Sequence, residues 1–395
     1  MTSIIEGYEY DIFISYRLSD SLSRIIRDYL IVELLKKEVD PIYRSYYDST
    51  TSPEAFYYLL EGQKSFRKRD FTHASEMFHK MIEIDSTNVL AMLGLIPSYG
   101  NQGYLTEARK WSQKAYENSM NSTRIEKLYV EGMHAFYFGT PFEVIKHHRQ
   151  MLEIDDQLTI AYYHIGLSYI ELEQYDKAIP ELEKVFEISE KWGSEIMWSF
   201  NYTALGLSYH KTGQFRKEEK LYKKAEKVFT DDIHIICRQA ILALVRGRTK
   251  QADEYLARFE SHRRNLGVSE ASIQSELGYT YTEGGKLDKA EEHYRNTLVL
   301  EPQSPVRMNN LAYLLIEKEL NLDEGMDLIE KALQHRPDNS YFLHTKGLGL
   351  YKQGKYQEAL EILQKSWDLR MEHARYNHEA SLHLEDAKKT VASMR

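Results

Sequence analysis

Two histidines near the C-terminus are of the residue type found in zinc hydrolases, but they do not have the spacing of such a site. The segment from His378 to His383 reads His-Glu-Ala-Ser-Leu-His, and two imidazoles with a glutamate are the groups that bind zinc and activate water in metalloproteases. These histidines are five positions apart, whereas two histidines share one face of a helix when they are four apart. The adjacent pair His147-His148 also points in two directions. We therefore expect neither a metal site nor a cofactor.

The remaining reactive side chains fall into no catalytic arrangement. Cys237 is the single cysteine, so the chain cannot form an intrachain disulfide or a zinc site built on several thiolates. The glycines of Gly347-Leu348-Gly349 suggest a phosphate loop, but the Gly-Lys-Ser/Thr ending of such a loop is missing. Paired glutamates such as Glu218-Glu219 are expected on outward faces of helices, where they favour solubility. The sequence predicts a protein that is not an enzyme.

A pattern of apolar, aromatic and small residues recurs from residue 55 to residue 373. Its clearest copies are Tyr162-x-x-Ile165-Gly166-x-x-Tyr169 and Tyr202-x-x-Leu205-Gly206-x-x-Tyr209. A second small residue follows twelve positions after the glycine. The period of about 34 residues is typical of helical hairpins that stack in order. We place nine repeats at 55–88, 89–122, 125–158, 159–192, 199–232, 233–266, 271–304, 305–339 and 340–373.

Both small positions have a packing explanation. The two helices of a hairpin approach closely, and a large side chain at either position would push them apart. Val144 and Glu218 occupy the second small position in the third and fifth repeats and depart from this pattern. Short inserts at 193–198 and 267–270 interrupt the period, and we expect them to lengthen a helix or a loop.

The whole spacing resembles that of the tetratricopeptide repeat (TPR) family over about 320 residues. The resemblance implies antiparallel helix pairs in a right-handed superhelix, with the first helices lining a concave groove that commonly holds a peptide or a partner helix. We predict an all-α fold: a right-handed TPR α-solenoid of about nine helix-turn-helix repeats. Residues 374–395 contain an amphipathic stretch that we interpret as a C-terminal capping helix.

The first 54 residues have a different character. Residues 10–17, Tyr-Asp-Ile-Phe-Ile-Ser-Tyr-Arg, are rich in β-formers and predict a strand. This segment resembles the opening strand of a TIR domain, and we interpret 1–17 as a remnant of such a domain. The body of the domain has no counterpart, so its NAD-cleaving activity is not inferred. Residues 18–54 are predicted to form a helix and a linker, which completes a short strand-helix segment before the repeats.

The family resemblance also predicts which side chains face the groove. The inward positions lie six, three and two residues before the glycine position and one, four and five after it. Aromatic rings at these positions can cover apolar side chains of a peptide, and asparagine amides can bond its backbone. No three consecutive repeats supply the Lys, Arg and Asn set that clamps a C-terminal carboxylate. The predicted groove residues are Tyr163, His164, Phe200, Thr203, His210, Lys211, Asn309, Asn310, Tyr313, Tyr341, His344, Tyr351 and Lys352.

Composition and net charge also limit which classes of partner are expected. The chain has 395 residues, a net charge of −9 and a pI near 6.0, which argues against nucleic acid or an anionic membrane as a partner. No apolar run reaches the length of a membrane span, and we expect a location in the bacterial cytoplasm. The predicted function is a scaffold that binds a protein or peptide partner. Two alternatives remain open: a regulatory or sensor module of a TIR-like or nucleotide-cyclase system, and a truncated remnant without function.

Overall fold

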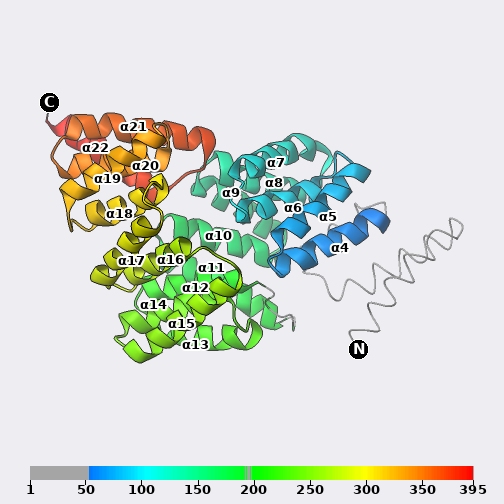
Figure 1. Cartoon of the computed structure of the whole chain (residues 1–395). Helices are drawn as coiled ribbons and strands as arrows, with labels where there is room; N and C mark the ends of the chain where they lie inside the picture. Colours follow the sequence, from blue (N-terminus) through cyan, green and yellow to red (C-terminus); the bar gives the residue numbers. More distant parts are fainter. Residues whose placement is uncertain (1–52, 192, 194–195, 197, 395) are drawn as a thin grey trace, which may run out of the picture. The chain divides into compact units, whose positions relative to one another are not determined.

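The computed structural model describes residues 53–191, 193, 196 and 198–394 (Figure 1). Over this part of the chain the regular structure is entirely helical: nineteen α-helices, α4 to α22, and one 3-10 turn, η2 (Ser119–Asn121). The predicted all-α class is confirmed for these residues. The TIR-like segment 1–17 and residues 18–52 of the predicted helix and linker lie outside the described residues. Among the described helices, none combines the length and apolar character that a membrane span requires.

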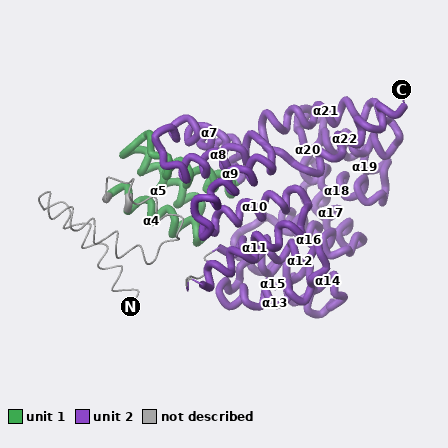
Figure 2. The backbone as a smooth tube through the Cα atoms, turned by 180° about the vertical axis from the view of Figure 1, so that it is seen from behind, with its two compact units in different colours: residues 1–102 green, residues 103–395 purple. Residues whose placement is uncertain are grey.

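The chain divides into two compact units, residues 1–102 and 103–395 (Figure 2). The described part of the first unit contains α4 (Pro53–Arg67), α5 (Phe71–Ile84) and α6 (Val89–Asn101). The boundary falls between the two helices of the predicted second repeat. The second unit, which we call unit 2, contains α7 (Leu105–Asn118), α8 (Arg124–Phe138), α9 (Pro141–Ile154), α10 (Thr159–Glu171), α11 (Tyr175–Lys191), α12 (Ser199–Lys211), α13 (Phe215–Val228), α14 (Ile233–Val245), α15 (Thr249–Asn265), α16 (Glu270–Glu283), α17 (Leu287–Leu300), α18 (Pro305–Glu317), α19 (Leu322–His335), α20 (Ser340–Lys352), α21 (Tyr356–His373) and α22 (His378–Ser393).

Consecutive helices pack as hairpins. In unit 2 the pairs are α8 with α9, α10 with α11, α12 with α13, α14 with α15, α16 with α17, α18 with α19, and α20 with α21. Each second helix also packs against the first helix of the next hairpin, as α11 does against α12 and α19 against α20. The last helix, α22, contacts both α21 and α20, so it covers the end of the last hairpin as the capping interpretation requires.

In some hairpins glycine occupies the first small position. A large side chain of the second helix, sixteen residues further on in the chain, then packs directly against that glycine. A Cβ atom placed at Gly166 would lie 2.7 Å from Cδ2 of Leu182, and one at Gly347 would lie 2.7 Å from Cδ2 of Leu363. These separations are shorter than any real contact between carbon atoms, so only glycine permits the observed approach of the two helices. The close packing predicted from the spacing is therefore present.

The second small position is also buried in the described hairpins. Ala178, Ala290 and Ala359 are completely buried there. The two departures are buried as well. Val144 packs in the core, and Glu218 is completely buried, so the expectation that it lies on an outward face is wrong. Glu218 accepts a hydrogen bond from Nδ1 of His210, at 3.1 Å from its Oε2. A buried carboxylate needs such a partner, because an uncompensated charge in the core is costly.

Turns and caps fix where the helices end. Gly213, between α12 and α13, has a φ of 71°, a left-handed conformation that glycine adopts without steric cost. Glu319 takes a φ of 54° in the corresponding turn before α19. The inserts lengthen the preceding helices: α11 and α15 each have 17 residues, whereas α9 and α13 have 14.

Candidate partner-binding surface

The first helices of unit 2 pack side by side and form one continuous face, which we call the inner wall. α10 contacts α12, α12 contacts α14, α14 contacts α16, and α18 contacts α20. Hydrogen bonds join α16 to α18, for example from Nδ2 of Asn310 to Oγ of Ser275 at 3.1 Å. The inner wall therefore runs from α10 to α20 and continues to α22, which packs beside α20.

Two long-range contacts show that the inner wall is concave. Nζ of Lys211 on α12 lies 3.0 Å from Oε2 of Glu283 on α16, although α14 lies between these helices in the stack. The hydroxyl of Tyr313 on α18 donates to Glu379 on α22, and α20 lies between them. Side chains can meet over an intervening helix only where the surface curves inward.

Aromatic side chains from three neighbouring segments gather at the start of α12. Tyr163 of α10 packs edge-on against Trp198, with ring centroids 6.4 Å apart. Phe200 of α12 lies 6.0 Å from the ring of His234 at the start of α14. We call these four residues the aromatic row. His234 is exposed and the other three are half-buried, so the row offers apolar ring surface with polar edges to a bound chain.

Other predicted residues of the fourth and fifth repeats face the protein itself. The ring of His164 lies 4.8 Å from that of His148, and burial lowers the pKa of His164 well below its ordinary value. His210 is turned to the buried carboxylate of Glu218, and Oγ1 of Thr203 donates to the carbonyl of Phe200 in the preceding turn. The contact between His164 and His148 joins two repeats, so the spacing of one repeat does not reveal it.

The predicted residues of the eighth and ninth repeats are tied to their neighbours. Asn309 accepts a hydrogen bond from Thr345 at 2.8 Å, and Tyr351 lies 3.0 Å from the hydroxyl of Thr390 on α22. Tyr341 is half-exposed beneath the guanidinium of Arg370, 4.2 Å from its ring centroid.

His344 differs most from its predicted role. Only 6% of the residue is exposed. Its Nε2 lies 3.0 Å from Nδ1 of His383, and the two rings stack. Burial lowers the pKa of His344 to about 3, so the imidazole stays neutral. The residue joins α20 to α22 and does not present a surface to a partner.

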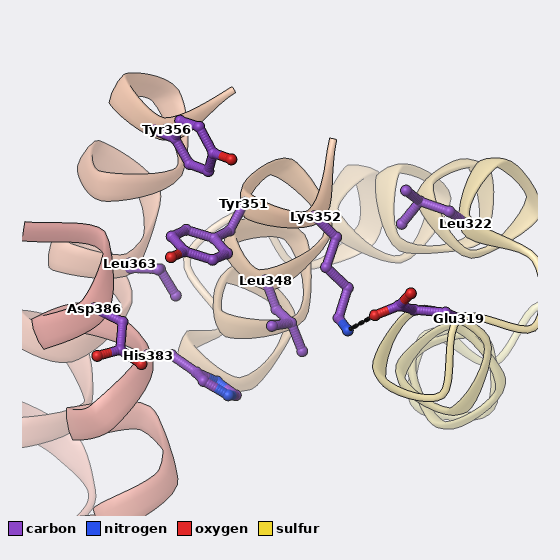
Figure 3. A pocket seen from close by; sticks show the side chains of 9 residues that line it. All are labelled: Glu319, Leu322, Leu348, Tyr351, Lys352, Tyr356, Leu363, His383 and Asp386. Carbon is purple, nitrogen blue, oxygen red and sulfur yellow. Dashed lines mark hydrogen bonds and ion pairs between the residues drawn. The ribbon is translucent and has the colours of Figure 1, made fainter. Parts of the chain in front are cut away.

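A cavity of about 640 Å³ lies between α22 and the last two hairpins (Figure 3). Two predicted groove residues, Tyr351 and Lys352, point into it, and Nζ of Lys352 is 2.7 Å from the carboxylate of Glu319. This ion pair lowers the pKa of Glu319. The full lining is Glu319, Leu322, Leu348, Tyr351, Lys352, Tyr356, Leu363, His383 and Asp386. An apolar floor with a few charged groups at its rim suits a small polar ligand or a side chain of a partner.

The histidine-rich segment does not bring its two histidines together. In the part of the chain that the structure describes, no group of three His, Cys, Asp or Glu side chains is placed to hold a metal ion. His378 lies 3.0 Å from the hydroxyl of Tyr376 while His383 faces His344, so the two histidines of that segment point to different neighbours.

Three residues of the inner wall were not predicted from the sequence: Trp198, His234 and His383. Trp198 and His383 belong to the aromatic row and the cavity, and neither occupies one of the inward positions of a predicted repeat. Trp198 is the last residue of the insert at 193–198. A tryptophan directly before a first helix could have indicated an additional residue of the inner wall. His383 became a wall residue because α22 packs beside α20, which depends on how the last helix folds back.

The comparisons with known proteins agree with the helical repeat. A family model described as tetratricopeptide repeat matches residues 160–191, which span nearly all of α10 and α11. A TPR repeat-containing protein of Methanocaldococcus jannaschii is 37% identical over 86 residues, 22% of this chain and 15% of that protein. An Hsp70-Hsp90 organizing protein of Triticum aestivum is 26% identical over 241 residues, 59% of this chain and 39% of that protein.

Similar solved structures include a tetratricopeptide repeat protein from Parabacteroides merdae. It has 16% identity and a TM-score of 0.39, and the match covers 66% of this chain and 98% of that one. The matched stretch spans at most 39% of the length of the two curated relatives named above.

Proposed function

We propose that this TPR-containing chain is a non-enzymatic scaffold that binds a peptide or a helix of a partner protein on its inner wall. The observation that carries this proposal is the aromatic row, because its ring pairs bridge α10, α12 and α14 on the concave face while its side chains stay partly exposed. Partly exposed aromatic rings that a partner can cover are frequent anchors of protein interfaces.

The bound segment would lie along the wall from the aromatic row toward Asn310 and Tyr351. Ring surface would cover its apolar side chains, and asparagine and tyrosine would bond its backbone. A single segment that contacts a few of these residues would bind with micromolar affinity, about −8 kcal/mol. The proposal includes a partner that is neither nucleic acid nor membrane, on the grounds of net charge. It also includes a cytoplasmic location in a bacterium, which follows from the family resemblance of the sequence.

The test compares two phenylalanine truncations. Phe200→Ala removes a ring of the aromatic row, and Phe142→Ala removes a 60% exposed ring from the second helix α9. Proteins retained by the immobilised wild-type chain are identified, purified, and titrated against each variant by calorimetry. We expect Phe200→Ala to weaken binding by on the order of tenfold, about 1.4 kcal/mol, and Phe142→Ala to leave the affinity unchanged.

Asn310→Ala is a second variant on the same wall, and we expect it to weaken binding without unfolding the chain. A partner whose affinity is unchanged by both Phe200→Ala and Asn310→Ala would place the site elsewhere. Far-UV circular dichroism of each variant separates lost binding from lost folding.

A second function is favoured by the cavity beside α22. Its size and mixed lining suit a small ligand, as a regulatory or sensor module would require. Such a ligand would raise the melting temperature of the wild-type chain, because a molecule that binds only the folded state stabilises it. A ligand screen in which Lys352→Ala abolishes the shift would support this function, and shifts that persist in Lys352→Ala would exclude the cavity.

A further inference from the structure

The connection between α21 and α22 packs against helices more than 200 residues earlier in the chain. Arg109 of α7 donates hydrogen bonds to the carbonyl oxygens of Ala374 and, at 3.3 Å, Met371. Nη1 of Arg375 lies 3.4 Å from the carboxylate of Glu171 at the end of α10. We call residues 371–377 the latch. It joins the last hairpin of unit 2 to α7, α8 and α10.

The surface beneath the latch combines a cation, an aromatic face and an anion. The guanidinium of Arg109 stacks over Phe138, 4.2 Å from the ring centroid, and donates to the carbonyl of Tyr137 at 2.5 Å. The guanidinium of Arg375 stacks over Phe136 at 4.5 Å while it pairs with Glu171. Phe136 and Glu171 therefore hold one arginine by its flat face and by its charge, the two ways in which a guanidinium is recognised.

The latch uses only groups that a different extended peptide could present. The four residues between α21 and α22 are not helical, and Asn377 has extended backbone with a φ of −142° and a ψ of 121°. The contacts to α7, α8 and α10 come from the carbonyl of Ala374, the carbonyl of Met371 in the last turn of α21, and the side chain of Arg375. These contacts require no side chain of the latch other than one arginine, which a partner peptide can also carry.

The latch is also replaceable on energetic grounds. The side chains of Arg375 and Glu171 are 37% and 22% exposed, and partly exposed ion pairs contribute little to stability. Burial lowers the pKa of Arg109, and no carboxylate in the described part of the chain pairs with it. A partner that offers Arg109 a carboxylate in place of the Ala374 carbonyl gains a charge-assisted bond of about twice the strength.

We propose that the surface formed by Arg109, Phe136 and Glu171 recognises an extended, arginine-bearing peptide, and that the latch occupies this surface until such a partner displaces it. This inference rests on the proposed scaffold function and names the chemistry of the partner. The latch acts as an intramolecular competitor, whose effective concentration is on the order of millimolar for a short connection. A partner that binds this surface more tightly than the latch can therefore displace it when its concentration is high enough.

The test uses a fluorescent peptide with the sequence of residues 369–380 and the full-length chain. Arg375→Ala in the chain removes the arginine of the latch and frees its site. We expect the peptide to bind this variant at least tenfold more tightly than the wild type, as measured by fluorescence anisotropy. A peptide that carries glutamate at the position of Arg375 should not bind, because it would face Glu171.

Two further variants keep the test decisive. Adding Glu171→Lys to Arg375→Ala should abolish binding of the arginine peptide. Lys389→Ala removes an exposed basic residue of α22 and should leave the peptide affinity at the wild-type level. Circular dichroism checks that each variant is folded, and a melting temperature checks that Arg375→Ala does not open the whole unit.

The outcomes separate this inference from the scaffold function. Equal binding of the arginine and glutamate peptides, or no binding to folded Arg375→Ala, would show that the latch only closes unit 2, while the effect of Phe200→Ala on partner affinity would remain. If the arginine peptide binds as expected but Phe200→Ala does not change the affinity of the partner, the latch surface is supported and the aromatic row is refuted as the partner site.

Discussion

The packing of Gly206 against Tyr222 makes a quantitative prediction about the helix pair α12–α13. Tyr222 is 1% exposed, and a Cβ atom at Gly206 would lie 2.5 Å from its Cε1 and closer still to Cζ and the hydroxyl oxygen. In an exposed helix, Gly→Ala stabilises by about 1 kcal/mol. Here the buried ring cannot retreat, and overpacking costs about 1–3 kcal/mol. Gly206→Ala should therefore destabilise the protein by up to about 2 kcal/mol, and Gly206→Leu by more.

A double-mutant cycle isolates the contact. The hydroxyl of Tyr222 is buried and has no hydrogen-bond partner among the described residues, and burial raises its pKa well above the ordinary value. Tyr222→Phe should then be neutral or stabilising by up to about 1 kcal/mol. Because the phenyl ring lacks the atom nearest to the new Cβ, Gly206→Ala should cost about 1 kcal/mol less in the Tyr222→Phe background.

The assay is urea unfolding followed by far-UV circular dichroism. Gly166→Ala is the matched control, because it meets Leu182 in the neighbouring hairpin and its effect should add to that of Tyr222→Phe. If Gly206→Ala proves stabilising, or its effect is the same in both backgrounds, α12 and α13 do not approach as closely as described and the explanation of the glycine position fails.

Two other predictions concern buried ionisable groups. Burial lowers the pKa of His148 from 6.5 to about 4. Between these two pH values the unfolded chain binds more protons at this residue than the folded chain does. The contribution of His148 to the free energy of unfolding is therefore complete above pH 6.5 and falls by on the order of 3 kcal/mol as the pH drops to 4. His148→Leu, which introduces the residue found at the equivalent position of α11 and α21, should flatten this dependence in urea titrations at several pH values. Glu218→Ala should destabilise the protein by about 2–4 kcal/mol because His210 loses its hydrogen-bond acceptor. Adding His210→Leu should recover part of that lost stability. If the double variant is as unstable as Glu218→Ala alone, the cavity and not the unpaired imidazole sets the cost.

The sequence by itself determined the features that repeat within one hairpin. Glycine at positions such as Gly166 and Gly347, a buried small residue twelve positions later, and capping and turn residues at helix ends are local requirements, and they recur with each period. They are visible in the sequence because every hairpin must meet the same steric conditions. The helical class and the packing explanation of the glycines could therefore be predicted.

Only the tertiary structure decided which inward-facing side chains remain available. His210 turns to Glu218, His344 to His383 and Tyr313 to Glu379, although all three occupy inward positions by spacing. The latch likewise brings Arg375 to Glu171, 204 residues away in the chain. For the contacts that join different hairpins the physical reason is curvature: small rotations between successive hairpins add up along the array, and their sum, which no single repeat specifies, sets which distant side chains meet.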